Sequence, residues 1–219
     1  MALTFNGSNN TIAGIASGGI NDNVVDNGTM ADDAIGVAEL SATGTASSST
    51  YLRGDNAWSA ISAGITEADT WRITAHTTSS GGGLTLTSNW ERGDTSWFGK
   101  LGTGMSESSG VFTFPSTGIW EVSFFGYAHD TGSASICGGH ISPTVDGGSN
   151  YTTSTSSYFH ISNLSTYTYG SFYNSCLLDI TDTSTHKTRF YVYSDGDVTW
   201  EGSTSTDAVS ATFKRLGDT

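Results

Sequence analysis

The chain of 219 residues has few basic residues, only 2 prolines and only 2 cysteines. Eight Lys and Arg stand against 21 Asp and Glu, which gives a formal net charge of -13 at neutral pH. A surface of that sign repels phosphate backbones and anionic membrane surfaces. We therefore expect no nucleic acid among the partners.

Targeting and membrane signals are also lacking. The start MALTFNGSNN has neither a basic n-region nor the long apolar core of a secretory signal. No stretch approaches the roughly 18 apolar residues of a membrane-spanning helix. We expect a soluble protein that is not exported by that route and does not insert into a membrane.

The two cysteines, Cys137 and Cys176, are not arranged as a CxxC pair and have no histidine at metal-finger spacing. Two buried thiols are the expected state. A disulfide stays open at this stage, because both residues fall in strand-like sequence and could become neighbours in a sheet.

Catalytic patterns are missing as well. The sequence has no Gly-x-Ser-x-Gly elbow, no phosphate-binding loop and no carboxylate pair on a defined scaffold. The histidines are dispersed, with no HxH or HExxH spacing, at His76, His129, His140, His160 and His186. We expect no enzyme, no cofactor and no catalytic or metal site, although one histidine on a three-fold axis could still hold an ion by symmetry.

Three further patterns have a functional and an ordinary interpretation. SDGDVTWEG places Asp195, Asp197 and Glu201 close together, but without EF-hand spacing, so a solvated turn is favoured over a calcium site. The Arg-Gly-Asp triplets at 53–55 and 92–94 are interpreted as turn sequence. The same holds for the Asn-x-Ser/Thr matches at Asn9, Asn27, Asn150 and Asn163.

What the chain does contain is typical of a β protein: 28 Gly and 11% aromatic residues. In GIWEVSFFGYA, the residues Trp120, Val122 and Phe124 alternate with polar ones, which predicts a strand with one buried face. PSTG at 115–118 supplies turn chemistry, so GVFTFP and GIWEVSFFGYAHD are predicted to form a hairpin. Further strands are predicted at 70–76, 134–141, 151–161, 169–180, 186–194 and 208–216. Eight or more strands without a helix indicate an all-β sandwich or jelly roll.

Residues 1–62 differ from the rest. They hold three aromatics, Phe5, Tyr51 and Trp58, and cannot bury enough apolar surface to fold alone. We expect an extended attachment or stem segment that other chains order. TMADDAIGVAELSA predicts one short helix over about 30–42, either packed against symmetry mates or replaced by a solvated linker turn.

Two resemblances narrow the class. SSGVFTFPSTGIWEVSFFGYAHD, SCLLDITDTSTHKTRFYVYSDG and the terminal AVSATFKRLG resemble, in order, the core strands of the jelly roll shared by tumour necrosis factor ligands and complement globular heads. This resemblance implies a TNF-like head over residues 63–219 and a homotrimer. Tyr191 and Tyr193 alternate with Phe190 and Val192, so this strand has apolar or aromatic residues on both sides, and we expect one side to serve the core and the other a neighbouring subunit.

The leading segment resembles the connector of tail-fibre-like structural proteins of bacteriophages. ADDAIGVAELSATGTASSSTYLRGDNAWSAI carries this likeness, with one copy of a unit that many relatives repeat. It implies a virion protein, assembled in the host cytoplasm and joined to other virion proteins through residues 1–62. A short tail fibre whose head binds a host glycan or protein is expected; a capsid decoration protein is the alternative, and a free-standing binding or catalytic domain stays open.

Overall fold

The computed structural model describes residues 4–6, 11–13, 36, 40–61, 64–130, 132–162 and 167–219. The chain divides into two units, 1–62 and 63–219. In the described residues of the first, strands β1 (Thr4–Asn6) and β2 (Thr11–Ala13) form one small hairpin, and β3 (Thr50–Leu52) and β4 (Trp58–Ala60) form another. Of the predicted helix at 30–42, residues 30–35 and 37–39 lie outside the described residues, and residues 36 and 40–42 are not helical.

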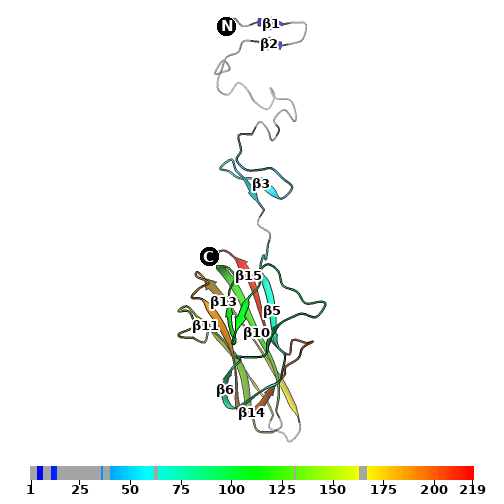
Figure 1. Cartoon of the computed structure of the whole chain (residues 1–219), viewed down its shortest axis with the longest axis vertical. Coiled ribbons are helices and arrows are strands. Elements are labelled where there is room, and N and C mark those ends of the chain that lie inside the picture. The colour runs from blue at the N-terminus through cyan, green and yellow to red at the C-terminus, as the bar shows by residue number, and fades with distance from the viewer. Residues whose placement is uncertain are drawn as a thin grey trace. The chain divides into compact units, whose positions relative to one another are not determined.

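The second unit is built from eleven strands (Figure 1). They are β5 (Ala68–Ile73), β6 (Thr77–Thr85), β7 (Trp90–Arg92), β8 (Ser106–Ser108), β9 (Val111–Thr113), β10 (Gly118–Asp130), β11 (Ile136–Thr144), β12 (Thr155–His160), β13 (Thr168–Ile180), β14 (Lys187–Trp200) and β15 (Val209–Gly217). No described residue is helical, and no helix in the described part of the chain is long and apolar enough to cross a membrane.

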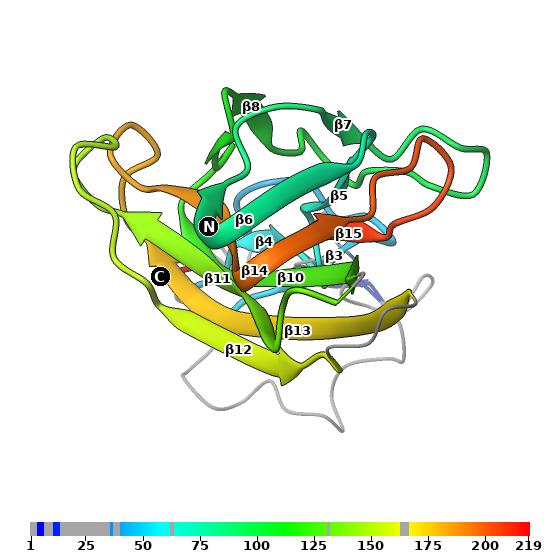
Figure 2. The same ribbon diagram turned by 90° about the horizontal axis from the view of Figure 1, so that it is seen from below.

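The strands form the two layers of a sandwich. One layer has the order β13-β10-β15-β5-β7, and Figure 2 shows β10 running between β13 and β15. The other has the order β12-β11-β14, with β6 and β9 sharing the far edge of β14 and β8 pairing with β9. The layers join where Ala128 and His129 of β10 pair with Trp200 and Thr199 of β14.

The predicted hairpin is wrong, although both of its strands exist. The strand β9 pairs with β14 and β8, whereas β10 pairs with β13 and β15, so the turn at 114–117 crosses from one layer to the other. The physical reason lies in the apolar side chains. Phe112 and Trp120 are both buried, and as members of opposite layers they cover the core from two sides.

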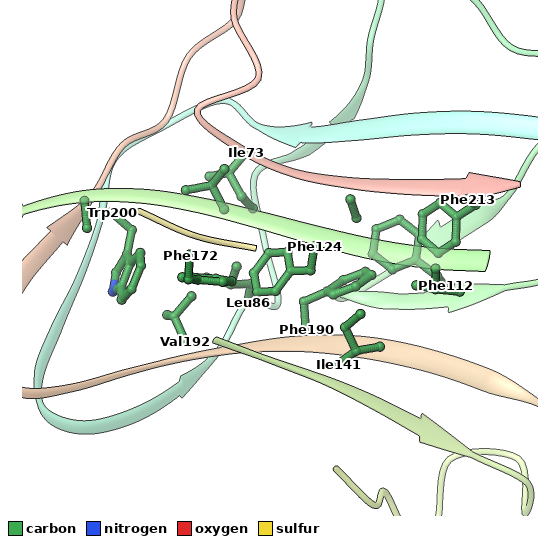
Figure 3. Close-up of a cluster of buried hydrophobic side chains, with 14 of the residues drawn as sticks. Ile73, Leu86, Phe112, Phe124, Ile141, Phe172, Phe190, Val192, Trp200 and Phe213 are labelled. Carbon is green, nitrogen blue, oxygen red and sulfur yellow. The ribbon is translucent and has the colours of Figure 1, made fainter. Parts of the chain in front are cut away.

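The core is a layer of aromatic rings between the two sheets (Figure 3). The alternation predicted for β10 is confirmed, because Trp120, Val122 and Phe124 are fully buried while the intervening side chains point outward. Across the core, Phe124 packs against Phe190 of β14 with ring centroids 4.8 Å apart, and within its own layer it packs against Phe172 of β13 at 5.0 Å. One buried polar contact also links the layers, since the Asn174 amide donates to the Gly139 carbonyl over 2.6 Å.

Replacing Trp120 with alanine should lower the free energy of unfolding by about 3–5 kcal/mol, because a large buried aromatic side chain is lost and a cavity remains. Trp97, which is 81% exposed, is the matched control, and Trp97→Ala should change stability by less than about 0.5 kcal/mol. Chemical denaturation followed by circular dichroism measures both variants. A Trp120→Ala protein as stable as its parent would contradict the register of β10.

Candidate interaction surfaces

Asp195 and Glu201 of SDGDVTWEG are engaged by different partners within the chain. Asp195 and Asp197 lie within strand β14, so the expected turn is wrong, and the strand continues through an irregularity between Ser194 and Asp197. The Asp195 carboxylate accepts the backbone amides of Ser135 and Ile136 at 2.7 and 2.9 Å, and these bonds hold its pKa below the ordinary range. Among the described residues, no group of three or more His, Cys, Asp and Glu is placed to hold a metal ion.

Glu201, the third acidic residue of that sequence, follows β14, and its carboxylate contacts two histidines. One carboxylate oxygen contacts the Nδ1 atom of His129, and the other lies 3.1 Å from Nδ1 of His76. His129 also packs edge-on against the ring of Tyr167, with centroids 4.8 Å apart. The structure therefore brings His76 and His129 together through one carboxylate, which sequence spacing did not show.

Both cysteines are free thiols, so the disulfide alternative does not hold. Cys137 is fully buried in β11, and burial raises its pKa to about 12. Cys176 lies on β13 and is half-buried, and its pKa is also raised by burial. The expectation of two buried thiols is therefore confirmed for Cys137, whereas Cys176 is only partly buried.

The Arg-Gly-Asp triplets are engaged within the chain. Arg53 pairs with Asp55 at 3.2 Å in the turn between β3 and β4. Arg92 binds the buried Asp69, with its Nε atom 3.0 Å from a carboxylate oxygen. Asp94 binds the fully buried Arg72. The second triplet begins at the end of strand β7 and only then enters a loop, and its two charged side chains hold that loop in place.

A first exposed aromatic surface covers the outward side of β10 and β13. Residues on β13 alternate so that Phe172 and Asn174 enter the core while Tyr173 and Leu177 remain 59% and 65% exposed. At the far end of the strands, Tyr127 stacks on Tyr169 with centroids 5.6 Å apart. We call this surface the β10/β13 face; its apolar members are Phe125, Tyr127, Tyr167, Tyr169, Tyr173 and Leu177.

A second aromatic surface lies on the outward side of the other layer. We call it the tyrosine patch; its members are His140, Tyr151, Tyr158, Arg189, Tyr191 and Tyr193. Phe190 and Val192 are in the core, as expected, and Tyr191 and Tyr193 alternate with them and point outward. Tyr191 packs against His140 and Tyr158 packs against Tyr193, with centroids 5.2 and 5.8 Å apart.

The sequence alone predicted only some of the residues on these two surfaces. Tyr191 and Tyr193 were visible from period-two alternation in YVYS. The same signal is present in FYNSCL, where Tyr173 and Leu177 were missed. His140, Tyr151 and Arg189 come together only through strand pairing and a loop, so no local pattern could have revealed them.

Comparison with known proteins identifies the fold of the chain, but it does not assign the chain to a family. No family model matches the chain, and no curated protein matches its sequence. Among solved structures, it is similar to the Eiger TNF from S. frugiperda, with a TM-score of 0.53 and 11% identity over 72% of this chain and 96% of that chain. Murine APRIL at pH 5.0 matches with a TM-score of 0.49 and 13% identity over 68% of this chain and 98% of that chain. The likeness to Eiger shows that the chain contains a TNF-like jelly roll, as predicted from the order of its strands.

Proposed function

We propose that the chain is a non-enzymatic, homotrimeric virion structural protein of a bacteriophage. In this proposal the jelly-roll head, residues 63–219, faces outward and binds the host surface as part of a short tail fibre. Residues 1–62 attach the protein to other virion proteins. The observation that supports the trimer is the exposed β10/β13 face. The observation that supports a virion protein is the connector-like sequence before the head.

Trimerisation is supported by where the exposed apolar side chains lie. Tyr173 and Leu177 point outward from β13, which among the described residues forms a main-chain ladder with β10 alone, while β12 lies alongside it and the Ser157 hydroxyl donates to the Tyr173 carbonyl over 3.1 Å. Contiguous apolar surface of this kind marks protein interfaces, and closed symmetry lets identical copies bury it. Glu121 and Lys214, whose charged groups lie 3.2 Å apart, add polar contacts on the same side of β10 and β15.

The strand that carries Tyr191 and Tyr193 was predicted to turn one side toward a neighbouring subunit, but the β10/β13 face is the better candidate for that contact. Tyr191 is half-buried within its own chain, whereas Tyr173 and Leu177 are mostly exposed. Burial in a trimer therefore removes more apolar surface from water at β13. This choice leaves the tyrosine patch on the outside of the assembly.

Attachment through the leading unit is supported by its sparse packing. Its described part from residue 40 onward is a hairpin held by main-chain bonds such as Trp58 to Thr43 at 2.8 Å and Arg53 to Ala57 at 2.9 Å. Tyr51, Leu52 and Ile61 are exposed. A unit with so little apolar burial gains stability when a partner covers these side chains.

Residues 63–219 alone should form a trimer, because the proposed contact lies within the head. Light scattering coupled to size exclusion measures the mass, and a monomer at micromolar concentration would refute the assembly. In the full chain, Leu177→Asp should dissociate the trimer by placing a charge in an apolar interface. Trp97→Ala, which alters an exposed apolar side chain outside the β10/β13 face, is the control and should remain trimeric.

A protein lacking residues 1–45 should fail to enter virions, whereas one whose head is replaced by an unrelated trimer should enter them. The reason is that the leading unit, and not the head, makes the proposed virion contact. Quantitative immunoblots of purified particles measure both. The reverse pattern would place the virion contact in the jelly roll, and labelling over the capsid shell in electron micrographs would favour the decoration role.

A further inference from the structure

We propose that the tyrosine patch is a binding site for a saccharide that carries a carboxylate, such as a uronic or sialic acid. This inference deepens the proposed function by naming a site and a ligand class, and it rests on that function only for the ligand's place on a host surface. The chemistry of the site is argued from the patch itself.

The aromatic rings of the patch lie against the sheet because glycines stand beneath them. A Cβ atom added at Gly83 of β6 would stand 1.1 Å from the Tyr191 hydroxyl oxygen, and one at Gly138 of β11 would stand 2.6 Å from Cδ1 of Tyr158. The two tyrosines therefore occupy space that side chains would otherwise fill. Rings backed by main chain in this way are held in position before a ligand arrives, which lowers the entropic cost of binding.

A depression of about 240 Å³ opens between Tyr191 and the neighbouring loop that carries Tyr151. It is lined by two tyrosine rings, an imidazole, two small hydroxyl side chains and one guanidinium: Tyr151, Tyr191, His140, Ser142, Thr153 and Arg189. A more open hollow is lined by Ile136, Tyr158 and Tyr193. Tyr158 packs against His140 of the first depression and against Tyr193 of the second hollow. The two hollows therefore lie along one row of aromatic side chains.

The imidazole of His140 fixes the polar centre of the patch. Its Nε2 atom lies 2.8 Å from the Tyr158 hydroxyl, and burial lowers the pKa of His140 below the ordinary value. At neutral pH the ring is therefore uncharged. A neutral imidazole beside tyrosine hydroxyls offers both donors and acceptors, which suits a ligand rich in hydroxyl groups.

Arg189 supplies the one full charge of the depression. Its guanidinium carbon lies 3.9 Å from the centre of the Tyr151 ring, so the cation is stacked and its position is constrained. The other four arginines, Arg53, Arg72, Arg92 and Arg215, each pair with a carboxylate, but Arg189 has no ion pair among the described residues. In a chain with 21 acidic residues and 8 basic ones, an arginine left without a carboxylate is available to a ligand that brings one.

These observations select the ligand class. A pyranose ring has an apolar face that can pack on tyrosine rings and hydroxyl edges that can bond to the neutral polar groups. A guanidinium recognises a planar carboxylate through two parallel hydrogen bonds, which a hydroxyl cannot match. Nucleic acid would bring stacking bases and negative charge too, but a chain of net charge -13 repels a polyphosphate backbone.

Saturation-transfer NMR on the full chain tests the site. Methyl β-glucuronide and N-acetylneuraminic acid serve as acidic probes, and methyl β-glucoside as the neutral counterpart of the first. At least one acidic probe should receive saturation, and titration should give it a lower Kd than methyl β-glucoside. Arg189→Gln should weaken that binding by about tenfold or more, because a charge-assisted hydrogen bond is lost.

Lys187→Gln is the matched control, since it removes a positive charge from the same side of the same strand outside the depression, and it should bind like the parent. Tyr191→Ala should abolish binding while the melting temperature shows that the fold is kept. The proposal is overturned if neither acidic probe binds, or if Arg189→Gln binds as tightly as the parent. Either result leaves trimer mass and particle incorporation untouched, so failure of this site is distinct from failure of the proposed function.

Discussion

The packing of Phe124 against Phe190 joins the two layers at the centre of the sandwich. Each ring lies on the inward side of a long strand, β10 and β14, and each touches further rings of the core, so the two strands fix one another's register. Because side chains alternate along a strand, fixing the inward residues also fixes every outward one. The exposed surfaces of the protein are therefore consequences of this core contact.

Those outward surfaces differ in a way that suits two roles. On the β10/β13 face, Tyr173 and Leu177 are 59% and 65% exposed, so most of each side chain lies in solvent. In the tyrosine patch, Tyr191 is held against Gly83 and beside His140. Exposed apolar side chains are stabilised most when a large flat partner covers them, whereas rings held in place are suited to a small ligand. A trimer contact on one layer and a ligand site on the other is the arrangement that best fits both sets of contacts.

The sequence predicted the parts of the fold that depend on alternating apolar residues. Strands β10, β13 and β15 lie within one residue of their expected bounds, since each alternates clearly. Strand β6 was not predicted, because TTSSGGGLT has no apolar alternation and its place is set by pairing with β14. The continuation of β14 through Asp195–Trp200 was missed for a related reason, as Ser-Asp-Gly-Asp is ordinarily turn sequence. Partners of strands, and hence the surfaces built across them, depend on contacts that local patterns do not encode.

The high glycine content of the head has a physical explanation in these same contacts. A Cβ atom at Gly126 or at Gly139 would stand 2.2 or 2.0 Å from the ring of Phe172, which enters the core between the layers. A Cβ atom at Gly170 would stand 2.2 Å from the ring of Phe159. Both in the core and on the tyrosine patch, a large aromatic ring thus lies over a glycine of a neighbouring strand. Glycine lowers strand stability when it stands alone, but here each of these glycines makes room for an aromatic ring whose burial or positioning offsets that cost. The high glycine content, which suggests loose structure, is therefore found in a closely packed fold. At Gly83 and Gly138 the lack of a side chain also helps to shape the surface that is proposed to bind a ligand.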